Sequence, residues 1–130
     1  MIASSQFLRR ILAVDAVTCV AAGVLLAFGG ATLESLTGLQ PALTQPAGYF
    51  LLAYAAFVGF LGSRATLPGA MVWLVIVGNA VWALESLMLL ALGWAHPTPL
   101  GHAFVIGQAL VVAAIAELQF IGLRRSARTA

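Results

Sequence analysis

The chain has 130 residues, of which 62% are apolar and only 8% are charged, with a formal net charge of +2. A soluble domain carries roughly 25% charged residues, and so small a charged fraction cannot cover the surface of a soluble core. We therefore expect one domain over residues 1–130 that lies in the lipid bilayer, and the scattered arginines, which form no basic face, predict no nucleic-acid partner.

The first apolar stretch covers residues 11–30 and is interrupted by one acid, Asp15. One interpretation makes Asp15 a proton- or cation-coupled carboxylate. The other makes it a structural carboxylate near the headgroups, balanced by Arg9 or Arg10 about one and a half turns earlier. A cleaved signal sequence is a third interpretation, but the run is long for one and Asp15 interrupts it. The stretch therefore predicts a first membrane span.

The second apolar stretch, residues 47–62, is shorter than the roughly 20 residues that a spanning helix needs. Pro46 fits the first turn of a helix, where no N–H is required, and Tyr49 fits the membrane interface. We expect a second span here, preceded by an outer loop near residues 31–46.

The third stretch, residues 71–93, has Trp73 and Trp94 near its ends as interfacial anchors. The fourth, residues 100–123, follows a proline-containing turn at residues 96–99. Together the four stretches predict an all-α membrane protein, a bundle of four transmembrane helices.

All positive charge comes from six arginines, since the chain has no lysine. If the N-terminus is cytoplasmic, every arginine lies on the cytoplasmic side and the two outer loops carry none. Cytoplasmic loops of membrane proteins are enriched in Lys and Arg. The bias predicts a multi-pass protein of the cell membrane with both termini in the cytoplasm, from Arg9, Arg10, Arg64, Arg124, Arg125 and Arg128.

The two halves of the chain resemble each other. A shift of 64 overlays residues 15–17 on 79–81, and a shift of 60 overlays 60–64 on 120–124. Chance similarity between apolar segments is the alternative explanation. If the match is an internal duplication, two helical hairpins run parallel and are related by a pseudo-two-fold axis along the membrane normal. The aligned acid and amide of the first and third spans then lie at equal depth.

A rise of about 1.5 Å per residue sorts the polar side chains of the spans into two layers. The layer nearer the cytoplasm, roughly 20–25 Å from the outer helix ends, holds an acid, an amide and a second acid: Asp15, Asn79 and Glu117. The layer roughly 10–12 Å from the outer side holds Tyr54, Glu85 and Gln108. Polar groups at these depths usually face protein or water.

Glu85 stands out because no arginine lies near it, and Trp82 separates it from Asn79 on the third span. One interpretation is a neutral acid hydrogen-bonded to Gln108 or Tyr54. The other is an acid that releases its proton when a ligand or ion enters. These alternatives stay open.

On the fourth span, Gln119 shares the face of Gln108, whereas Glu117 lies about 180° away. One of these faces looks away from the bundle centre. We expect Glu117 to contact a second subunit or to extend toward Arg124 or Arg125.

Motifs for catalysis are missing from the sequence: no phosphate-binding glycine loop, nucleophile elbow or zinc signature is present. His96 and His102, six residues apart with two prolines between them, do not match a metal motif. The sequence predicts no cofactor, no metal and no enzymatic activity.

We expect a small carrier or channel-like bundle for a small solute, ion or lipid. The candidate pathway residues are Asp15, Asn79, Trp82, Glu85 and Gln108. The alternative is a non-catalytic membrane module that binds a lipid or a partner membrane protein, with the polar residues joining helices. Because four short helices enclose little volume, a path is expected between subunits, which favours a homo-oligomer.

Overall fold

The computed structural model describes residues 2–93 and 95–128, so Trp94, an expected interfacial anchor, lies outside the described residues. Four helices are long and apolar enough to cross a membrane: α1 (Gln6–Phe28), α3 (Pro41–Ser63), α4 (Gly69–Ala91) and α5 (Pro99–Arg125). A helix of this length extends about 34 Å or more, which exceeds the roughly 30 Å of hydrocarbon. The predicted helical architecture with four apolar spans is confirmed.

The helices begin earlier than hydropathy predicts. Ser5 caps α1, and its Oγ accepts a hydrogen bond from the Leu8 N–H at 3.1 Å. Arg9 and Arg10, placed before the first span by the sequence, therefore lie within α1. Hydropathy marks only the apolar part of a helix, whereas the capping side chain determines its first residue.

The start of α3 corrects the prediction for Pro46. Pro41 occupies the start of the helix, and Pro46 lies inside it instead of in its first turn. A proline at the first helical position needs no N–H partner, whereas an internal proline removes one backbone hydrogen bond. The polar residues that precede Pro46 extend α3 beyond the segment that hydropathy detects.

A short helix, α2 (Gly30–Thr37), occupies part of the predicted outer loop. Gly38, with φ of 73°, ends α2 in the left-handed conformation that glycine tolerates best. The loop before α5 is fastened to α2, because the Thr98 N–H donates to the Thr37 carbonyl at 2.9 Å and the Thr98 hydroxyl donates to the Leu36 carbonyl at 2.6 Å. The two hairpins are therefore joined at this end, which we call the α2 end.

The opposite end, which we call the terminal end, is closed by a small antiparallel sheet. Its three two-residue strands are β1 (Ile2–Ala3), β2 (Thr66–Leu67) and β3 (Ala127–Arg128), in the order β2-β1-β3. Strands this short carry no sequence periodicity, so the sequence did not predict them. The sheet holds the start of the chain between the α3–α4 connection and the segment that follows α5.

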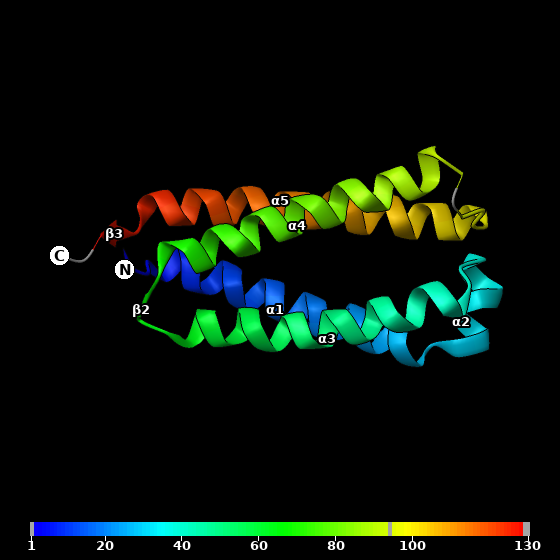
Figure 1. The fold of residues 1–130 in the computed structure, drawn as a ribbon, viewed down its shortest axis with the longest axis horizontal. Helices are drawn as coiled ribbons and strands as arrows, with labels where there is room; N and C mark the ends of the chain where they lie inside the picture. Colours follow the sequence, from blue (N-terminus) through cyan, green and yellow to red (C-terminus); the bar gives the residue numbers. More distant parts are fainter. Residues whose placement is uncertain (1, 94, 129–130) are drawn as a thin grey trace.

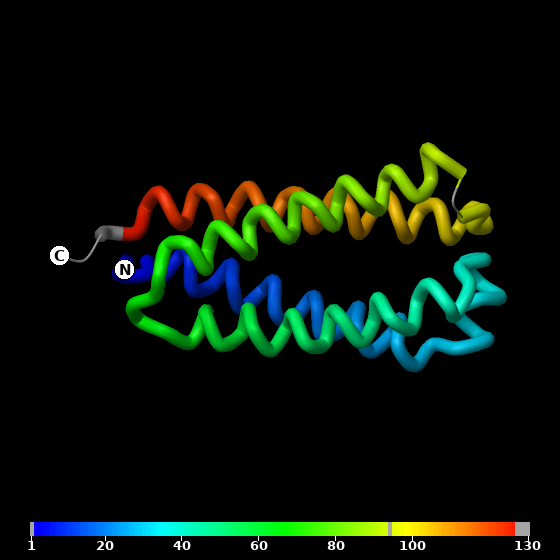
Figure 2. The backbone as a smooth tube through the Cα atoms, in the orientation of Figure 1, coloured from blue at the N-terminus to red at the C-terminus, as the bar shows by residue number. Residues whose placement is uncertain are grey.

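The long helices form two antiparallel pairs, α1 with α3 and α4 with α5 (Figures 1 and 2). Glycine allows α1 and α3 to approach closely: a Cβ at Gly23 would lie 2.9 Å from the Leu52 side chain, and one at Gly48 would collide with the backbone of Ala27. On its other side, α1 packs against α5, where a Cβ at Gly122 would lie 3.1 Å from the Leu8 Cα atom. Thus α1 is the central helix of the bundle.

This central position bears on the proposed duplication. Gly62 and Gly122 are aligned by the repeat, yet both face α1, at Leu12 and Leu8 respectively. The close contact at Gly23 also has no counterpart, because the aligned residue of the second hairpin is Leu87. The two hairpins are thus packed differently, and the duplication stays a prediction.

Buried apolar side chains are distributed unevenly along the bundle. Near the terminal end one cluster joins α1, α3 and α4 through residues such as Leu12, Val58 and Val72, all with no exposed surface. Toward the α2 end, the buried cluster consists of residues from α1, α2 and α3, including Cys19 and Leu51. Less tight packing of α4 in this half leaves space inside the bundle.

Candidate functional site

A buried polar cluster lies about midway along α1. Asp15, Asn79 and Gln119 are 3%, 4% and 0% exposed. The Asn79 amide nitrogen donates to Asp15 Oδ2 and to Gln119 Oε1, both at 2.8 Å, and the Gln119 amide nitrogen donates to the same Asp15 oxygen at 2.6 Å. The three side chains form a closed triangle of hydrogen bonds.

Two further side chains complete this cluster. The Tyr54 hydroxyl donates to Asn79 Oδ1 at 3.2 Å and to the Val75 carbonyl at 3.1 Å, and the Cys19 thiol donates to Asp15 Oδ1 at 3.4 Å. The amide–carboxylate cluster, as we call these five residues, takes side chains from all four long helices. Within the described part of the chain, no buried side-chain nitrogen or oxygen lacks a hydrogen-bond partner. The cluster therefore fixes how the four helices are aligned along their axes.

The cluster shows the environment of Asp15 and corrects part of one interpretation, while the coupled role of the carboxylate stays a prediction. Asp15 and Asn79, predicted to lie at equal depth, are in direct contact. The expected balance by arginine is wrong for Arg9, since its Nε–H donates to the Gly62 carbonyl at 3.3 Å and its side chain is exposed. Neutral amide, thiol and hydroxyl groups surround the carboxylate instead.

The sequence did not single out Gln119 as a site residue. Its shared face with Gln108 was the available signal, and the structure buries Gln119 fully while exposing Glu117. The face that looks away from the bundle centre is thus that of Glu117, and its contact with a second subunit or with Arg124 or Arg125 stays a prediction.

A second polar group lies closer to the α2 end. The Trp82 indole N–H donates to Gln108 Oε1 at 2.9 Å, and the Gln108 amide nitrogen donates to the Val105 carbonyl at 2.9 Å. The bond from Glu85 to Gln108 or Tyr54, which one of the two interpretations required, is not formed, and the bonds of these two side chains go to other residues. Among the described residues, none forms a hydrogen bond with the Glu85 carboxylate.

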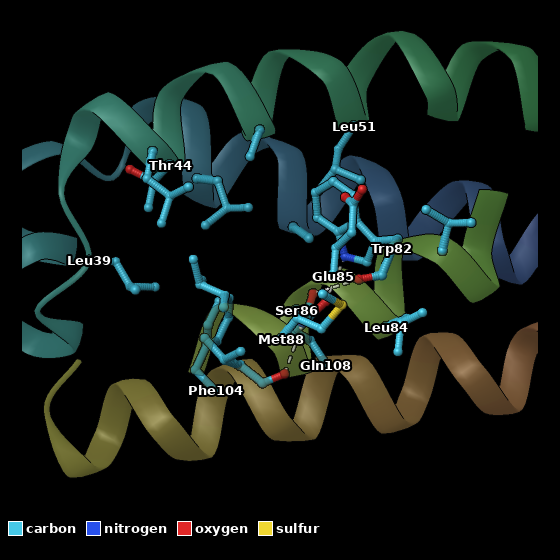
Figure 3. Close-up of a pocket in the computed structure, with 17 residues that line it drawn as sticks. Leu39, Thr44, Leu51, Trp82, Leu84, Glu85, Ser86, Met88, Phe104 and Gln108 are labelled. Atoms are coloured by element: carbon cyan, nitrogen blue, oxygen red, sulfur yellow. Dashed lines mark hydrogen bonds between the residues drawn. The ribbon is translucent and has the colours of Figure 1, made fainter. Parts of the chain in front are cut away.

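Glu85 lines a cavity of about 610 Å³ in the half of the bundle nearer the α2 end (Figure 3). Most of its wall is aliphatic or aromatic and comes from α1, α3, α4 and α5. Five lining residues carry polar atoms in their side chains: Thr44, Trp82, Glu85, Ser86 and Gln108. We call it the larger cavity.

A smaller cavity of about 240 Å³ lies beside it and reaches the amide–carboxylate cluster. The two cavities share four lining residues, Ala22, Leu51, Trp82 and Gln108. The bonded pair of Trp82 and Gln108 thus belongs to the partition between them. The single chain contains both cavities, although the sequence suggested that four helices would enclose little volume.

The structure places every predicted pathway residue at a cavity wall. Asp15 and Asn79 line the smaller cavity, Glu85 lines the larger one, and Trp82 and Gln108 line both. Their arrangement follows the bundle axis, with the buried cluster at one end and Glu85 at the other.

Aromatic rings form a continuous stack beside these walls. Phe50 stacks on Trp82 with 6.1 Å between ring centroids and 9° between planes, and on Tyr54 with 5.9 Å and 16°. Phe50 and Tyr54 come from α3 and Trp82 comes from α4, so the stack connects the two hairpins beside the smaller cavity.

The chemical groups at the two cavities are mainly apolar and aromatic. The part of the chain that the structure describes contains no group of three His, Cys, Asp or Glu side chains placed to hold a metal ion. The site offers an apolar volume, a stack of aromatic faces and a few polar side chains.

Neither a protein-family model, nor a curated protein, nor a solved structure matches this chain. Its class therefore follows from the fold and the site alone. Four helices of membrane-spanning length and hydropathy define a multi-pass membrane protein, and two adjoining cavities lie between these helices.

Proposed function

We propose that this protein is a small carrier of the cell membrane that binds a mostly apolar molecule in the larger cavity. The observation that carries the proposal is the cavity of about 610 Å³ with an apolar wall and few polar groups. Pockets for small molecules usually have about 300–1,000 Å³, mainly apolar walls and a few polar groups that orient the ligand.

Three residues at the cavity wall support entry from the lipid. Leu43 of α3 is 40% exposed, and Leu84 and Met88 of α4 are 57% and 37% exposed. These apolar side chains line the larger cavity and are also exposed on membrane-spanning helices. We therefore infer that the opening of the cavity faces the acyl chains of the bilayer. A ligand dissolved in the bilayer then reaches the cavity without crossing water.

The buried cluster favours a division of roles between the two polar groups. Asp15, Asn79 and Gln119 satisfy one another, which fits the role of joining helices that the alternative proposal assigns to all polar residues. Glu85, in contrast, faces the larger cavity without a hydrogen-bond partner among the described residues. The carrier proposal therefore rests on the cavity, and a membrane module that only packs against a partner helix would need no such volume.

The distribution of arginines supports an orientation. Arg64, Arg124 and Arg125 lie at the terminal end, where their guanidinium groups rest over Phe60, Phe120 and Phe7 at 5.6, 5.7 and 5.0 Å from the ring centroids. We infer that the terminal end faces the cytoplasm and that the α2 end faces outward. Homo-oligomerisation stays a prediction, and a cavity within one chain does not require it.

The proposal is tested by energy transfer from Trp82 to the neutral apolar fluorophore N-phenyl-1-naphthylamine. Of the three tryptophans, Trp73 and Trp94 are changed to Phe, so that Trp82 at the cavity wall is the only donor. The protein is placed in nanodiscs of phosphatidylcholine. We expect transfer that saturates as the probe concentration rises, because a cavity has a fixed number of sites.

Two alanines of α1 provide a matched pair. Ala22 lines both cavities, whereas its neighbour Ala21 is exposed on the outer surface. Ala22→Phe should weaken probe binding about tenfold or more, and Ala21→Phe should leave it unchanged, since only the first fills the cavity. Transfer that never saturates, or equal binding in both variants, would show that the cavity is not a binding site.

A further inference from the structure

The two cavities have walls of one charge sign. Their described lining residues include two acids, Asp15 and Glu85, and no Arg, Lys or His. The arginines lie at the terminal end, while Glu85 lies about 24 Å along α4 from its start at Gly69. No basic side chain is therefore available at the cavity wall to neutralise Glu85.

The position of Glu85 makes a neutralising partner valuable. Glu85 lies about 9 Å along the helix from Ala91, inside the span, and its exposed side chain borders the apolar volume. A carboxylate at such a depth is unfavourable unless a cation, a hydrogen-bond donor or water accompanies it. Gln108, the amide in the lining of this cavity, accepts from Trp82 and donates to the Val105 carbonyl, and it forms no hydrogen bond with Glu85.

One ring of the aromatic stack, Trp82, borders the larger cavity, and the other two, Phe50 and Tyr54, border the smaller cavity beside it. Trp82 lines both cavities and stacks on Phe50, which stacks in turn on Tyr54. Aromatic faces attract cations and also offer flat apolar surface to an organic group. The carboxylate, the aromatic rings and the apolar wall together suit one kind of molecule. This molecule carries a positive charge on a large apolar body.

We propose that the ligand of the larger cavity is a lipophilic organic cation whose charge is balanced by Glu85. This inference rests on the proposed function, because it names the class of molecule that the cavity takes. The apolar body fills the volume between α3 and α4, and the charge lies beside the carboxylate with Trp82 close by. An anion of the same shape is excluded, since both acids repel it and no basic side chain of the wall attracts it.

The same reasoning disfavours a phospholipid. A phosphatidylethanolamine headgroup would bring its phosphate into the cavity together with its ammonium. The wall offers that phosphate no basic partner among the described residues. The cation is therefore a free amphiphile dissolved in the membrane and not part of a lipid headgroup.

Tetraphenylphosphonium and tetraphenylborate provide a direct test, because they have nearly the same shape and opposite charge. Each is used to displace bound N-phenyl-1-naphthylamine from the purified full chain in nanodiscs. We expect the phosphonium to displace the probe at a concentration at least tenfold below that of the borate. A short-chain phosphatidylethanolamine should displace the probe no better than the borate does.

Glu85→Gln keeps the size of the side chain and removes its charge. The variant should weaken phosphonium binding about tenfold and should affect binding of the neutral probe much less. Glu117→Gln is the matched control, because Glu117 is exposed like Glu85 but lines neither cavity. Folding of both variants is checked by size-exclusion chromatography, and the phosphonium–borate comparison on the parent stands even if a variant fails to fold.

The possible results distinguish the assignment of an organic cation as ligand from the proposed carrier function. Saturable binding of the neutral probe without a preference for the phosphonium overturns the cation assignment and leaves the carrier proposal in place. Equal displacement by phosphatidylethanolamine and phosphonium also overturns it, in favour of a lipid. If the neutral probe does not bind, the proposed function itself is wrong.

Discussion

Gln119 shows how one buried amide completes a site. Its carboxamide oxygen accepts from Asn79 and its nitrogen donates to Asp15, so both ends of the group are used. An apolar side chain of similar size would have filled the same space without polar atoms. Because a buried donor or acceptor is costly when its partner is lost, each member of this cluster depends on the others.

Gln119→Leu should therefore destabilise the protein. The change removes one of the two amide donors to Asp15 Oδ2 and leaves Asn79 with one acceptor fewer. We expect a loss of about 1–3 kcal/mol in the free energy of unfolding, measured by titration with dodecyl sulfate in mixed micelles. Gln45→Leu on the exposed surface of α3 is the control and should have little effect. Equal stability of the parent and Gln119→Leu would show that the cluster does not hold the helices together.

At this scale the sequence predicted part of the cluster. Asp15 and Asn79 could be paired because depth follows from counting residues along a helix. Tyr54 was assigned to the other layer, with Glu85 and Gln108, but its hydroxyl contacts Asn79. Gln119 was assigned to no layer, because the direction that each helix face takes depends on how the helices pack. The partners of Glu85 were wrong for the same reason: Gln108 lies at a suitable depth but is bonded to Trp82.

The central helix α1 owes its position to small residues on its neighbours. Gly48 of α3 sits against the backbone of Ala27, and Gly122 of α5 sits against Leu8. Small residues permit close approach of membrane helices, whose association depends on packing and polar contacts and gains little from the hydrophobic effect. The second hairpin has no close contact that corresponds to the one at Gly23. At this level, nearer the α2 end, α4 leaves room for the larger cavity.

Gly48→Ala should separate α1 from α3. The added methyl group collides with the Ala27 backbone, which cannot rotate away as a side chain would. Overpacking of this kind costs about 1–3 kcal/mol, and the same unfolding titration should detect it. At Gly107 of α5 a methyl group meets nothing within 4 Å, so Gly107→Ala should be neutral or slightly stabilising. A Gly48→Ala variant as stable as the parent would contradict the close α1–α3 contact.

The sequence predicted the existence of the helices far better than their ends. Apolar runs identify the segments that lipid surrounds, so four spans could be counted. The residues that begin a helix, such as Ser5 and Pro41, act through capping and backbone geometry outside those runs. The short helix α2 and the strands β1 to β3 carry no comparable apolar pattern, and only the structure reveals them.

For the whole molecule, the interior volume was the main surprise. Length and number of helices gave no reason to expect a cavity of about 610 Å³ in one chain. Such a volume depends on the relative tilt of helices, which composition and periodicity do not encode. Figure 1 shows α4 rising away from α1 toward the α2 end, the half of the bundle in which the cavity lies.

The orientation in the membrane can be tested by labelling single cysteines from outside the cell. In a Cys19→Ser background, Gln40→Cys and His96→Cys should react with a membrane-impermeant maleimide, because both residues are exposed at the α2 end. Ala65→Cys, exposed in the connection between α3 and α4 at the terminal end, should react only after the membrane is permeabilised. Labelling of position 65 in intact cells would reverse the orientation.

The small sheet at the terminal end has a consequence for biosynthesis. Its central strand, β1, precedes both of its partners along the chain, so β1 is synthesised before β2, and β2 before β3. The first helical hairpin can enter the bilayer while the second is still being synthesised. The hydrogen bonds between β1 and β3, and the bond from the Ser5 N–H to Ser126 Oγ at 3.0 Å, must wait until α5 has left the exit tunnel. The nascent protein therefore passes through a stage in which all four helices exist and one end of the bundle is still unfastened.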